Sequence, residues 1–249
     1  MPESGIYGAP VKKERGESVS LTTTASHLLF MPGYQEVKIY CATQYRRALC
    51  PRLERVVKYT AATTTYTDYS SAAIDRVDAN VVVLDAMVVT DILYLGTKTP
   101  VRGFYFNMAA GQVNANAATL DVEYMSAISA GTATFADVAS DSDGTDSGGA
   151  TLAQDGVYTF TALPAGTVKN GRITADPLLS ADLYWYRFKP SATLSASIDI
   201  SDIIPISYDT NYGYSEAGSE TFSPNIAQCG AFEFDHTSTD TLYITWIQR

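Results

Sequence analysis

Short runs in which apolar and polar residues alternate dominate this chain and constrain its fold more than any other feature. Around residue 122, Leu120 and Val122 fall on one side of an extended chain, while Asp121 and Glu123 fall on the other. Patches of Ser, Thr, Gly, Asp and Ala separate such runs, and no stretch of helical length has an amphipathic helical spacing. The pattern predicts antiparallel sheets with a solvated face and almost no helix.

The middle of the chain carries a series of these runs, separated by short polar segments. The candidate strands are 55–60, 80–85, 91–95, 102–108, 118–125, 156–161, 183–189 and 196–200. Such a series predicts an all-β protein whose centre is an antiparallel β-sandwich of jelly-roll type. The only helical turn that we expect lies near residues 70–77.

The two ends of the chain are expected to combine. Two late strands, 231–235 and 241–247, cannot form a domain alone, so we expect them to pair with strands from residues 18–59. The first residues are rich in Gly, Pro and charge without periodicity, which is typical of an extended segment. We therefore predict an N-terminal arm at 1–17, a smaller β-sandwich from 18–54 with 208–249, and a central jelly-roll-like sandwich at 55–207.

Charge is distributed unevenly along the chain, whose net charge is −10. Residues 1–58 hold nine Lys and Arg against five Asp and Glu, whereas the remainder holds eight against 22. The acidic body disfavours a nucleic-acid partner. The basic front end suits an acidic partner, including a second copy of the chain. The candidate interface residues are the basic Lys12, Lys13, Arg15, Arg46 and Arg47, and the tyrosines of a Gly- and Asn-rich loop, Tyr208, Tyr212 and Tyr214.

The sequence favours a protein that is made in the cytoplasm and stays out of the membrane. No apolar run approaches the roughly 18 residues of a membrane helix. The N-terminus lacks the basic-then-apolar order of a secretory signal. The three cysteines, Cys41, Cys50 and Cys229, have no metal-site spacing, so we predict buried or free thiols, with a Cys41–Cys50 bridge as the alternative.

Residues that carry out catalysis are sparse, and we predict that the protein is not an enzyme and needs no cofactor. Only two histidines occur, and the nucleotide, zinc-protease and serine-hydrolase motifs are missing from the sequence. A glycosidase-type pair of carboxylates remains an alternative, with Glu123 and Glu233 as candidates by elimination.

One run has the composition of a cation site. Asp141, Asp143 and Asp146 alternate with small residues around Gly144, and hard cations prefer several carboxylate oxygens on a tightly turning backbone. The position where a calcium loop of the EF-hand type has its Glu is Ala150. We therefore keep two interpretations, a bound calcium ion and a solvated acidic loop, and favour the second.

The middle of the chain resembles virion structural proteins of tailed bacteriophages. The resemblance covers roughly residues 55–200 and rests on a tyrosine strand, an alternating strand, a Gly-rich loop and an aromatic strand. These segments are Asp91–Gly96, Leu120–Tyr124, Asp143–Thr145 with Gly148–Gly156, and Leu183–Phe188. The resemblance implies a β-sandwich on a capsid or tail surface and supplies no catalytic residues.

We therefore expect a non-enzymatic virion structural protein, assembled in the host cytoplasm. The leading hypothesis is a capsid decoration or cement protein that forms a homo-oligomer and attaches to the major capsid protein or other virion proteins. A neck or tail component is the related option. The alternative is a carbohydrate-binding or receptor-binding adhesin on the same fold, with tyrosines and the Asp141–Asp146 loop at its sugar site.

Overall fold

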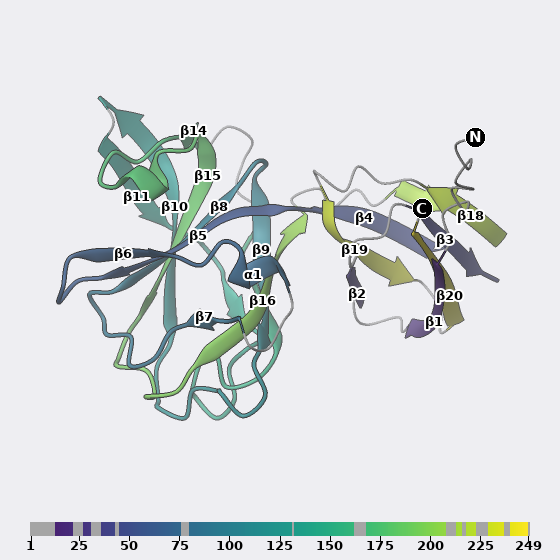
Figure 1. The fold of residues 1–249 in the computed structure, drawn as a ribbon, viewed down its shortest axis with the longest axis horizontal. Coiled ribbons are helices and arrows are strands. Elements are labelled where there is room, and N and C mark those ends of the chain that lie inside the picture. Colours follow the sequence, from purple (N-terminus) through teal and green to yellow (C-terminus); the bar gives the residue numbers. More distant parts are fainter. Residues whose placement is uncertain are drawn as a thin grey trace, which may run out of the picture. The chain divides into compact units, whose positions relative to one another are not determined.

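The chain divides into two compact units, one of which is discontinuous in sequence. The computed structural model describes residues 13–21, 27–30, 36–42, 45–75, 80–130, 132–161, 168–207, 213–215, 218–222, 229–236 and 240–248. The smaller unit contains Met1–Leu49 and Asp209–Arg249, and the larger unit is Cys50–Tyr208 (Figure 1). The sequence placed these boundaries at 54/55 and 207/208.

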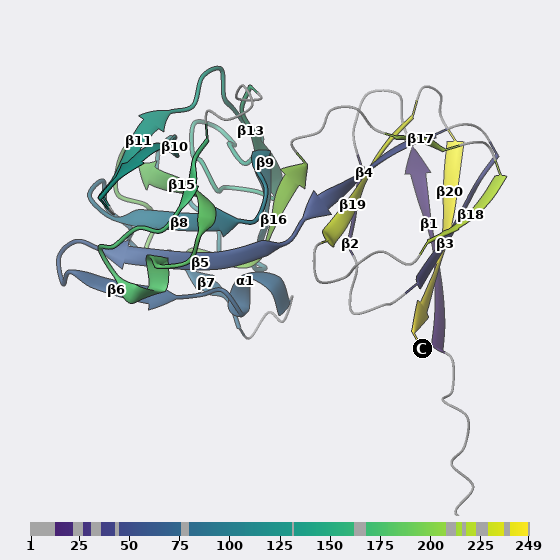
Figure 2. The same cartoon turned by 90° about the horizontal axis from the view of Figure 1, so that it is seen from above.

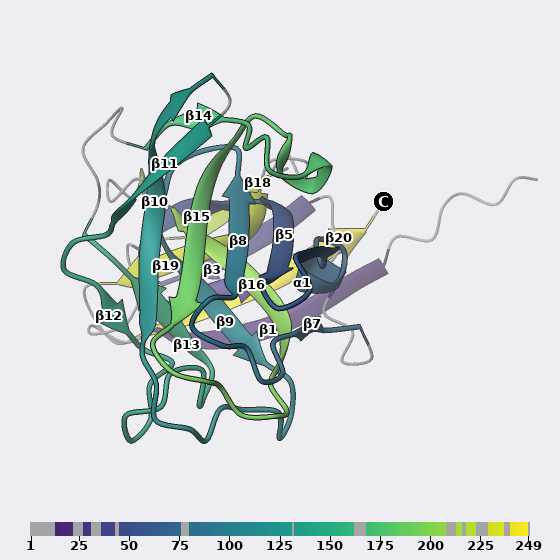
Figure 3. The ribbon, with the colours of Figure 1, turned by 90° about the vertical axis from the view of Figure 1, so that its left-hand side faces the viewer.

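The first sheet of the larger unit has seven strands. Their order across the sheet is β11-β10-β15-β8-β5-β6, and β14 pairs separately with β15. The strands are β5 (Leu53–Thr60), β6 (Thr65–Asp68), β8 (Ile92–Thr97), β10 (Leu120–Ser129), β11 (Thr132–Asp137), β14 (Asn170–Gly171) and β15 (Leu183–Pro190). Figure 3 shows β10, β15, β8 and β5 side by side.

The second sheet of the larger unit has five strands in the order β12-β13-β9-β16-β7. They are β7 (Val82–Val83), β9 (Val101–Met108), β12 (Ser142–Asp143), β13 (Gly156–Thr159) and β16 (Asp199–Ser207). The helical elements of this unit are the short α1 (Ala72–Asp75) and the 3-10 turn η1 (Pro177–Leu179). Every strand pair that the structure describes in these two sheets is antiparallel.

Eight of these strands pair in a nested order. The first and the last, β7 and β16, pair with each other, as do the second and seventh, β8 and β15. The third and sixth, β9 and β13, also pair, and so do the fourth and fifth, β10 and β11. The chain is therefore folded like a long hairpin that is rolled up, with β16–β9 and β15–β10 contacts closing the two sheets.

The core of the larger unit lies between its two sheets. Phe188 of β15 is fully buried, and three aromatic rings of the opposite sheet meet its ring edge to face: Phe104, Phe106 and Tyr158. Ring centroids lie 5.5–5.7 Å apart in these pairs, which is the preferred aromatic geometry. This packing confirms the predicted all-β sandwich of antiparallel sheets.

A second, smaller apolar cluster lies on the other face of the seven-stranded sheet. Trp185 is its centre, and the indole nitrogen donates hydrogen bonds to the carbonyls of Gly171 (3.0 Å) and Ala181 (3.3 Å). Leu179 of η1 belongs to the same cluster. The segment from β14 to η1 therefore covers part of this outer face.

The smaller unit contains two four-stranded sheets, with strand orders β1-β20-β3-β18 and β17-β4-β19-β2. The strands are β1 (Lys13–Leu21), β2 (His27–Phe30), β3 (Glu36–Cys41), β4 (Tyr45–Pro51), β17 (Gly213–Ser215), β18 (Gly218–Phe222), β19 (Cys229–His236) and β20 (Asp240–Gln248). Strands from the two chain ends alternate in both sheets, as Figure 2 shows for β1, β20, β3 and β18.

Two details of the sequence prediction are wrong. Residues 13–17, assigned to the arm, belong to β1, which pairs with β20 from Lys13 to Leu21. Among the described strands, β1 lies at the edge of its sheet. Edge strands often carry charged residues, so the run of charges at 12–15 did not look like a strand in the sequence. Tyr214, assigned to a loop, lies in β17. Residues 1–12, including Lys12, and the proposed loop tyrosines Tyr208 and Tyr212 lie outside the described residues.

Two further predictions concern the cysteines and membrane spans. Cys41 and Cys50 are buried thiols and form no bridge with each other. In the part of the chain that the structure describes, no helix is both long and apolar enough to cross a bilayer.

Candidate functional site on the outer face of the larger sheet

Cross-strand register assembles a row of polar and aromatic residues on the outer face of the seven-stranded sheet. Because Val122 and Phe188 point into the core, their neighbours along β10 and β15 face outward. Asp121 is paired with Lys189, and Tyr59 is paired with both Ile92 and Tyr66. Since Phe188 is paired with Leu93, Lys189 comes next to Ile92. These residues form one row across β10, β15, β8, β5 and β6: Asp121, Lys189, Ile92, Tyr59 and Tyr66.

A second row runs beside the first and is displaced from it by two residues along each strand that both rows share. It contains Asp137, Glu123, Arg187 and Tyr94, which are successive register partners on β11, β10, β15 and β8. We call the two rows together the outer-face strip. Six strands of a single sheet position its side chains, so the relative positions of these residues are set by backbone hydrogen bonds.

Glu123 is the hub of an ion-pair network in the strip. Arg187 binds it with two guanidinium nitrogens, Nη2 at 2.9 Å from Oε1 and Nε at the other oxygen. Lys189 Nζ lies 3.0 Å from Glu123 Oε2 and 3.1 Å from Asp121 Oδ2. Burial alone would raise the pKa of Glu123, but hydrogen bonds from Arg187 and Lys189 outweigh it and lower that pKa. Glu123 is therefore an ionised, fully engaged carboxylate.

An aromatic ring also packs against the planar face of the Arg187 guanidinium group. The guanidinium carbon lies 4.2 Å from the centroid of the Phe135 ring, a cation–π geometry. Burial raises the pKa of Tyr94 despite the opposing effect of nearby Arg187. The Tyr94 phenol therefore keeps its proton at neutral pH. Arg187 is therefore held by the carboxylate of Glu123 and by the ring of Phe135.

The aromatic end of the strip is the pair of Tyr59 and Tyr66, whose ring centroids lie 4.7 Å apart at an interplanar angle of 39°. Both rings are half-buried and pack against the Trp185 cluster. Burial raises the pKa of Tyr66, and Tyr59 and Asp176 add to the increase. The Tyr66 phenol therefore keeps its proton at neutral pH, and the two rings lie beyond the charged network of the strip.

The acidic members of the strip do not form a metal site. Ligand oxygens of Asp121, Glu123 and Asp137 lie within 4.8 Å of one another. However, Lys189 Nζ already lies between Asp121 and Glu123, and Arg187 occupies both oxygens of Glu123. A divalent cation would have to displace an internal cation, so the residues present do not fit a metal ion.

The carboxylates of the predicted calcium loop are used to fold the loop. Asp143 Oδ1 accepts a hydrogen bond from the backbone N–H of Thr145 at 2.8 Å, and Asp146 Oδ1 accepts one from Gly149 at 3.2 Å. Asp141 accepts a hydrogen bond from the Tyr158 hydroxyl, and burial together with this bond raises the pKa of Tyr158. Asp141, Asp143 and Asp146 do not form a group of converging ligand oxygens among the described residues. The solvated-loop interpretation fits this geometry better than the calcium one.

The predicted interface residues are partly brought together in the smaller unit. Arg46 is the register partner of Tyr214, and Arg47 is that of Gly213, across the β4–β17 pair. Lys13 and Arg15 lie on another strand, β1, opposite Gln248 and Trp246 of β20. Their role in binding stays a prediction.

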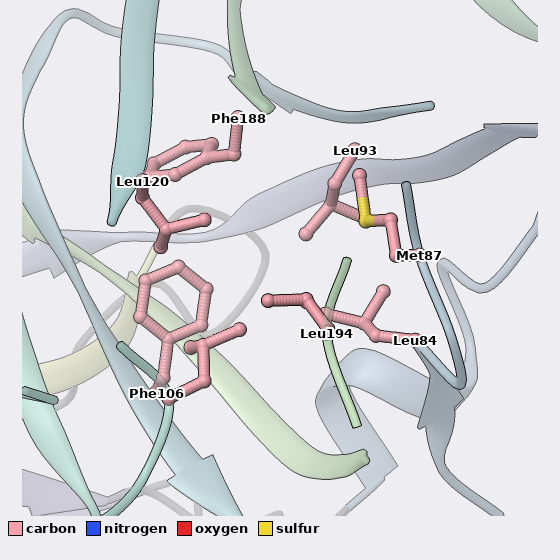
Figure 4. Close-up of a pocket in the computed structure, with 8 residues that line it drawn as sticks. Leu84, Met87, Leu93, Phe106, Leu120, Phe188 and Leu194 are labelled. Carbon is pink, nitrogen blue, oxygen red and sulfur yellow. The ribbon is translucent and has the colours of Figure 1, made fainter. Parts of the chain in front are cut away.

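The larger unit also contains an internal cavity, shown in Figure 4, but it is not a binding site. It lies between the two sheets, and its volume is about 10 Å³, close to that of one water-sized sphere. Only apolar side chains line it: Leu84, Met87, Leu93, Phe106, Leu120, Leu152, Phe188 and Leu194. An apolar void of this size is a packing defect that stays dry.

The sequence indicated some of the strip and missed the rest. Alternation in residues 118–124 predicted Asp121 and Glu123 on a wet face. The structure places both on the outer face of the sheet, but only Asp121 is exposed there, whereas Glu123 is buried among its ion-pair partners. Arg187 and Lys189 alternate with the buried Tyr186, Phe188 and Pro190. This signal was available in the sequence but was interpreted only as an aromatic strand. Comparisons with protein-family models, curated proteins and solved structures find no match for the chain.

Proposed function

We propose that the protein is a non-enzymatic structural protein of a virion, most specifically a capsid decoration or cement protein. The observation that carries the proposal is the nested pairing of eight strands in the larger unit, and we interpret this nesting as that of a jelly roll. Double-sheet jelly rolls occur in viral capsid and lectin domains. Fold alone does not determine function, so the fold supports the proposal together with the resemblance of the sequence to phage virion proteins.

Attachment in this proposal is electrostatic and repeated by symmetry. The larger unit holds ten Lys and Arg against 17 Asp and Glu. The smaller unit carries the basic pairs of β1 and β4, which suit an acidic surface on the major capsid protein or on a second copy of the chain. Many modest contacts, repeated around a symmetric particle, add up to firm retention.

Incorporation into particles tests this proposal. We expect the chain to co-purify with intact virions of the virus that encodes it and to be located on their surface by electron cryomicroscopy. The double variant Arg46→Glu/Arg47→Glu should reduce occupancy on particles, whereas Lys98→Glu in the larger unit should not. Virions that lack the chain altogether would refute the proposal.

The second candidate function is that of a receptor-binding adhesin that recognises carbohydrate. One observation favours it: the outer-face strip places an aromatic pair beside fixed charged groups. The strip does not support a glycosidase in the same way. Glu123 is held ionised by Arg187 and Lys189, which is unsuitable for a general acid, and Glu233 lies in β19 of the other unit.

A further inference from the structure

We propose that the outer-face strip of the larger unit binds an uncharged oligosaccharide, with the Tyr59–Tyr66 pair as its stacking platform. This inference rests on the second candidate function and gives it a location. It replaces the Asp141–Asp146 loop, which the sequence suggested as part of a sugar site, because those carboxylates fold their own loop.

The platform has the chemistry that a pyranose ring needs. The C–H groups on one face of a sugar ring pack against aromatic rings, while its hydroxyls need donors and acceptors at the rim. Tyr59 and Tyr66 offer two tilted, half-buried rings that pack against the Trp185 cluster, and Ile92 lies next to Tyr59 in the row. The hydroxyls at the edge of the two rings can donate and accept hydrogen bonds, and burial raises the pKa of the Tyr66 phenol, which stays protonated.

Fixed polar groups continue the platform along the same row. Lys189 and Asp121 follow Ile92 across β15 and β10, and their ion pairs hold them in place before any ligand arrives. Asp121 keeps 53% of its side chain exposed, so it can accept hydrogen bonds from sugar hydroxyls. Groups that are ordered in advance reduce the entropic cost of binding.

The length and charge of the strip define the ligand class. From Tyr66 to Asp121 the row spans four strand spacings of about 4.8 Å, roughly 19 Å in all. This length fits a short oligosaccharide better than a single ring. Three carboxylates, Asp121, Glu123 and Asp137, face two cations in the strip, and the larger unit is acidic as a whole. Sialylated or sulfated glycans are therefore disfavoured by repulsion.

Glycan-array screening of the full-length chain, followed by calorimetry with the best neutral oligosaccharide, tests the inference. We expect binding to neutral glycans that strengthens from mono- to oligosaccharide, and no preference for sialylated or sulfated ones. Tyr66→Ala should weaken binding about tenfold, since it removes one stacked ring. Tyr66→Phe keeps the ring and should lose less affinity. Asp121→Ala, at an exposed site, should weaken binding without affecting the fold.

A matched control comes from the smaller unit. Tyr40 and Tyr243 also form a cross-strand pair, with 47% and 54% of each residue exposed and ring centroids 6.2 Å apart. Tyr243→Ala should leave glycan binding unchanged. If binding is lost in Tyr243→Ala and kept in Tyr66→Ala and Asp121→Ala, the adhesin function stands but the location is wrong. If the wild-type chain binds only anionic glycans, or none, the inference is overturned. Incorporation into virions is measured separately and is unaffected by either result.

Discussion

At the scale of single residues, the outer-face strip shows how neighbours decide what a charged side chain can do. Glu123 has only 9% of its side chain exposed, yet it is ionised because Arg187 and Lys189 offset the cost of burying its charge. Asp143 and Asp146 of the Asp141–Asp146 loop, which are only partly exposed, instead accept hydrogen bonds from backbone N–H groups. Residue type alone suggested a cation site in that loop and gave no sign of the ion pairs of Glu123.

Replacing Glu123 by Gln should make the protein less sensitive to acid. The pKa of Glu123 is lower in the folded chain than in the unfolded one, so its ion pairs stabilise the fold above the unfolded pKa of about 4.3 and stop doing so as the pH falls through the folded pKa. At pH 7 we expect Glu123→Gln to lower the free energy of unfolding by about 2 kcal/mol. Near pH 3 the difference from wild type should shrink.

Urea unfolding at the two pH values provides the measurement. Glu54→Gln is the matched control, because Glu54 pairs with Lys98, whose side chain is 60% exposed, and exposed pairs contribute little. A difference between wild type and Glu123→Gln that is the same at both pH values would contradict the assigned network.

At the scale of elements, alternation predicted the strands that bury one face and missed those that do not. The predicted central strands correspond to β5, β7, β8, β9, β10, β13, β15 and β16. The edge strand β6, Thr65–Asp68, is half-buried only at Tyr66 and otherwise exposed, so its sequence carries no periodic signal.

The end of β16 was missed because its residues are buried, whereas β6 was missed because its residues are exposed. The prediction stopped at residue 200, whereas β16 continues to Ser207. Ile203, Ile204 and Ile206 are all buried, so the apolar residues do not alternate. Proline is rare in central strands because it has no N–H donor. Beyond Ile200, however, the described pairing of β16 is with β9 alone, so Pro205 is tolerated where one side of the strand needs no N–H donor.

Close backbone approach in the β9–β13 pair gives a prediction at this scale. A Cβ at Gly103 would lie 2.3 Å from the carbonyl oxygen of Tyr158, so Gly103→Ala must force the two strands apart. A Cβ at Gly96 would meet only side-chain atoms, of which Leu183 Cδ1 at 2.8 Å is the nearest. We expect Gly103→Ala to lower the thermal midpoint more than Gly96→Ala. Equal midpoints would show that β9 and β13 are not this close.

At the scale of the whole molecule, the two units differ in how they can be built. The larger unit is continuous, Cys50–Tyr208, and contains both of its sheets and its own core. The sequence suggested that the chain ends combine because two late strands had no partners nearby. What the sequence did not predict is the strand order, since pairing between residues far apart depends on side-chain packing that no local pattern encodes.

The larger unit should therefore fold without the rest of the chain. We expect a fragment of residues 50–208 to give a β-type circular dichroism spectrum, dispersed amide resonances and a single cooperative unfolding transition. A fragment of residues 1–49 should remain unfolded, because its strands depend on β18, β19 and β20 for pairing. A disordered 50–208 fragment would contradict the independence of this unit.

The discontinuous smaller unit has a consequence for synthesis on the ribosome. Strands β1 to β4 emerge first, but their partners β17 to β20 are made only after all of residues 50–208. At translation rates of about 5–20 residues per second, the early strands wait on the order of ten seconds or more with unmatched backbone groups. During that interval the early strands can bind chaperones or pair with strands of other nascent chains. Production of the intact chain should therefore be more sensitive to elongation speed than production of the fragment of residues 50–208.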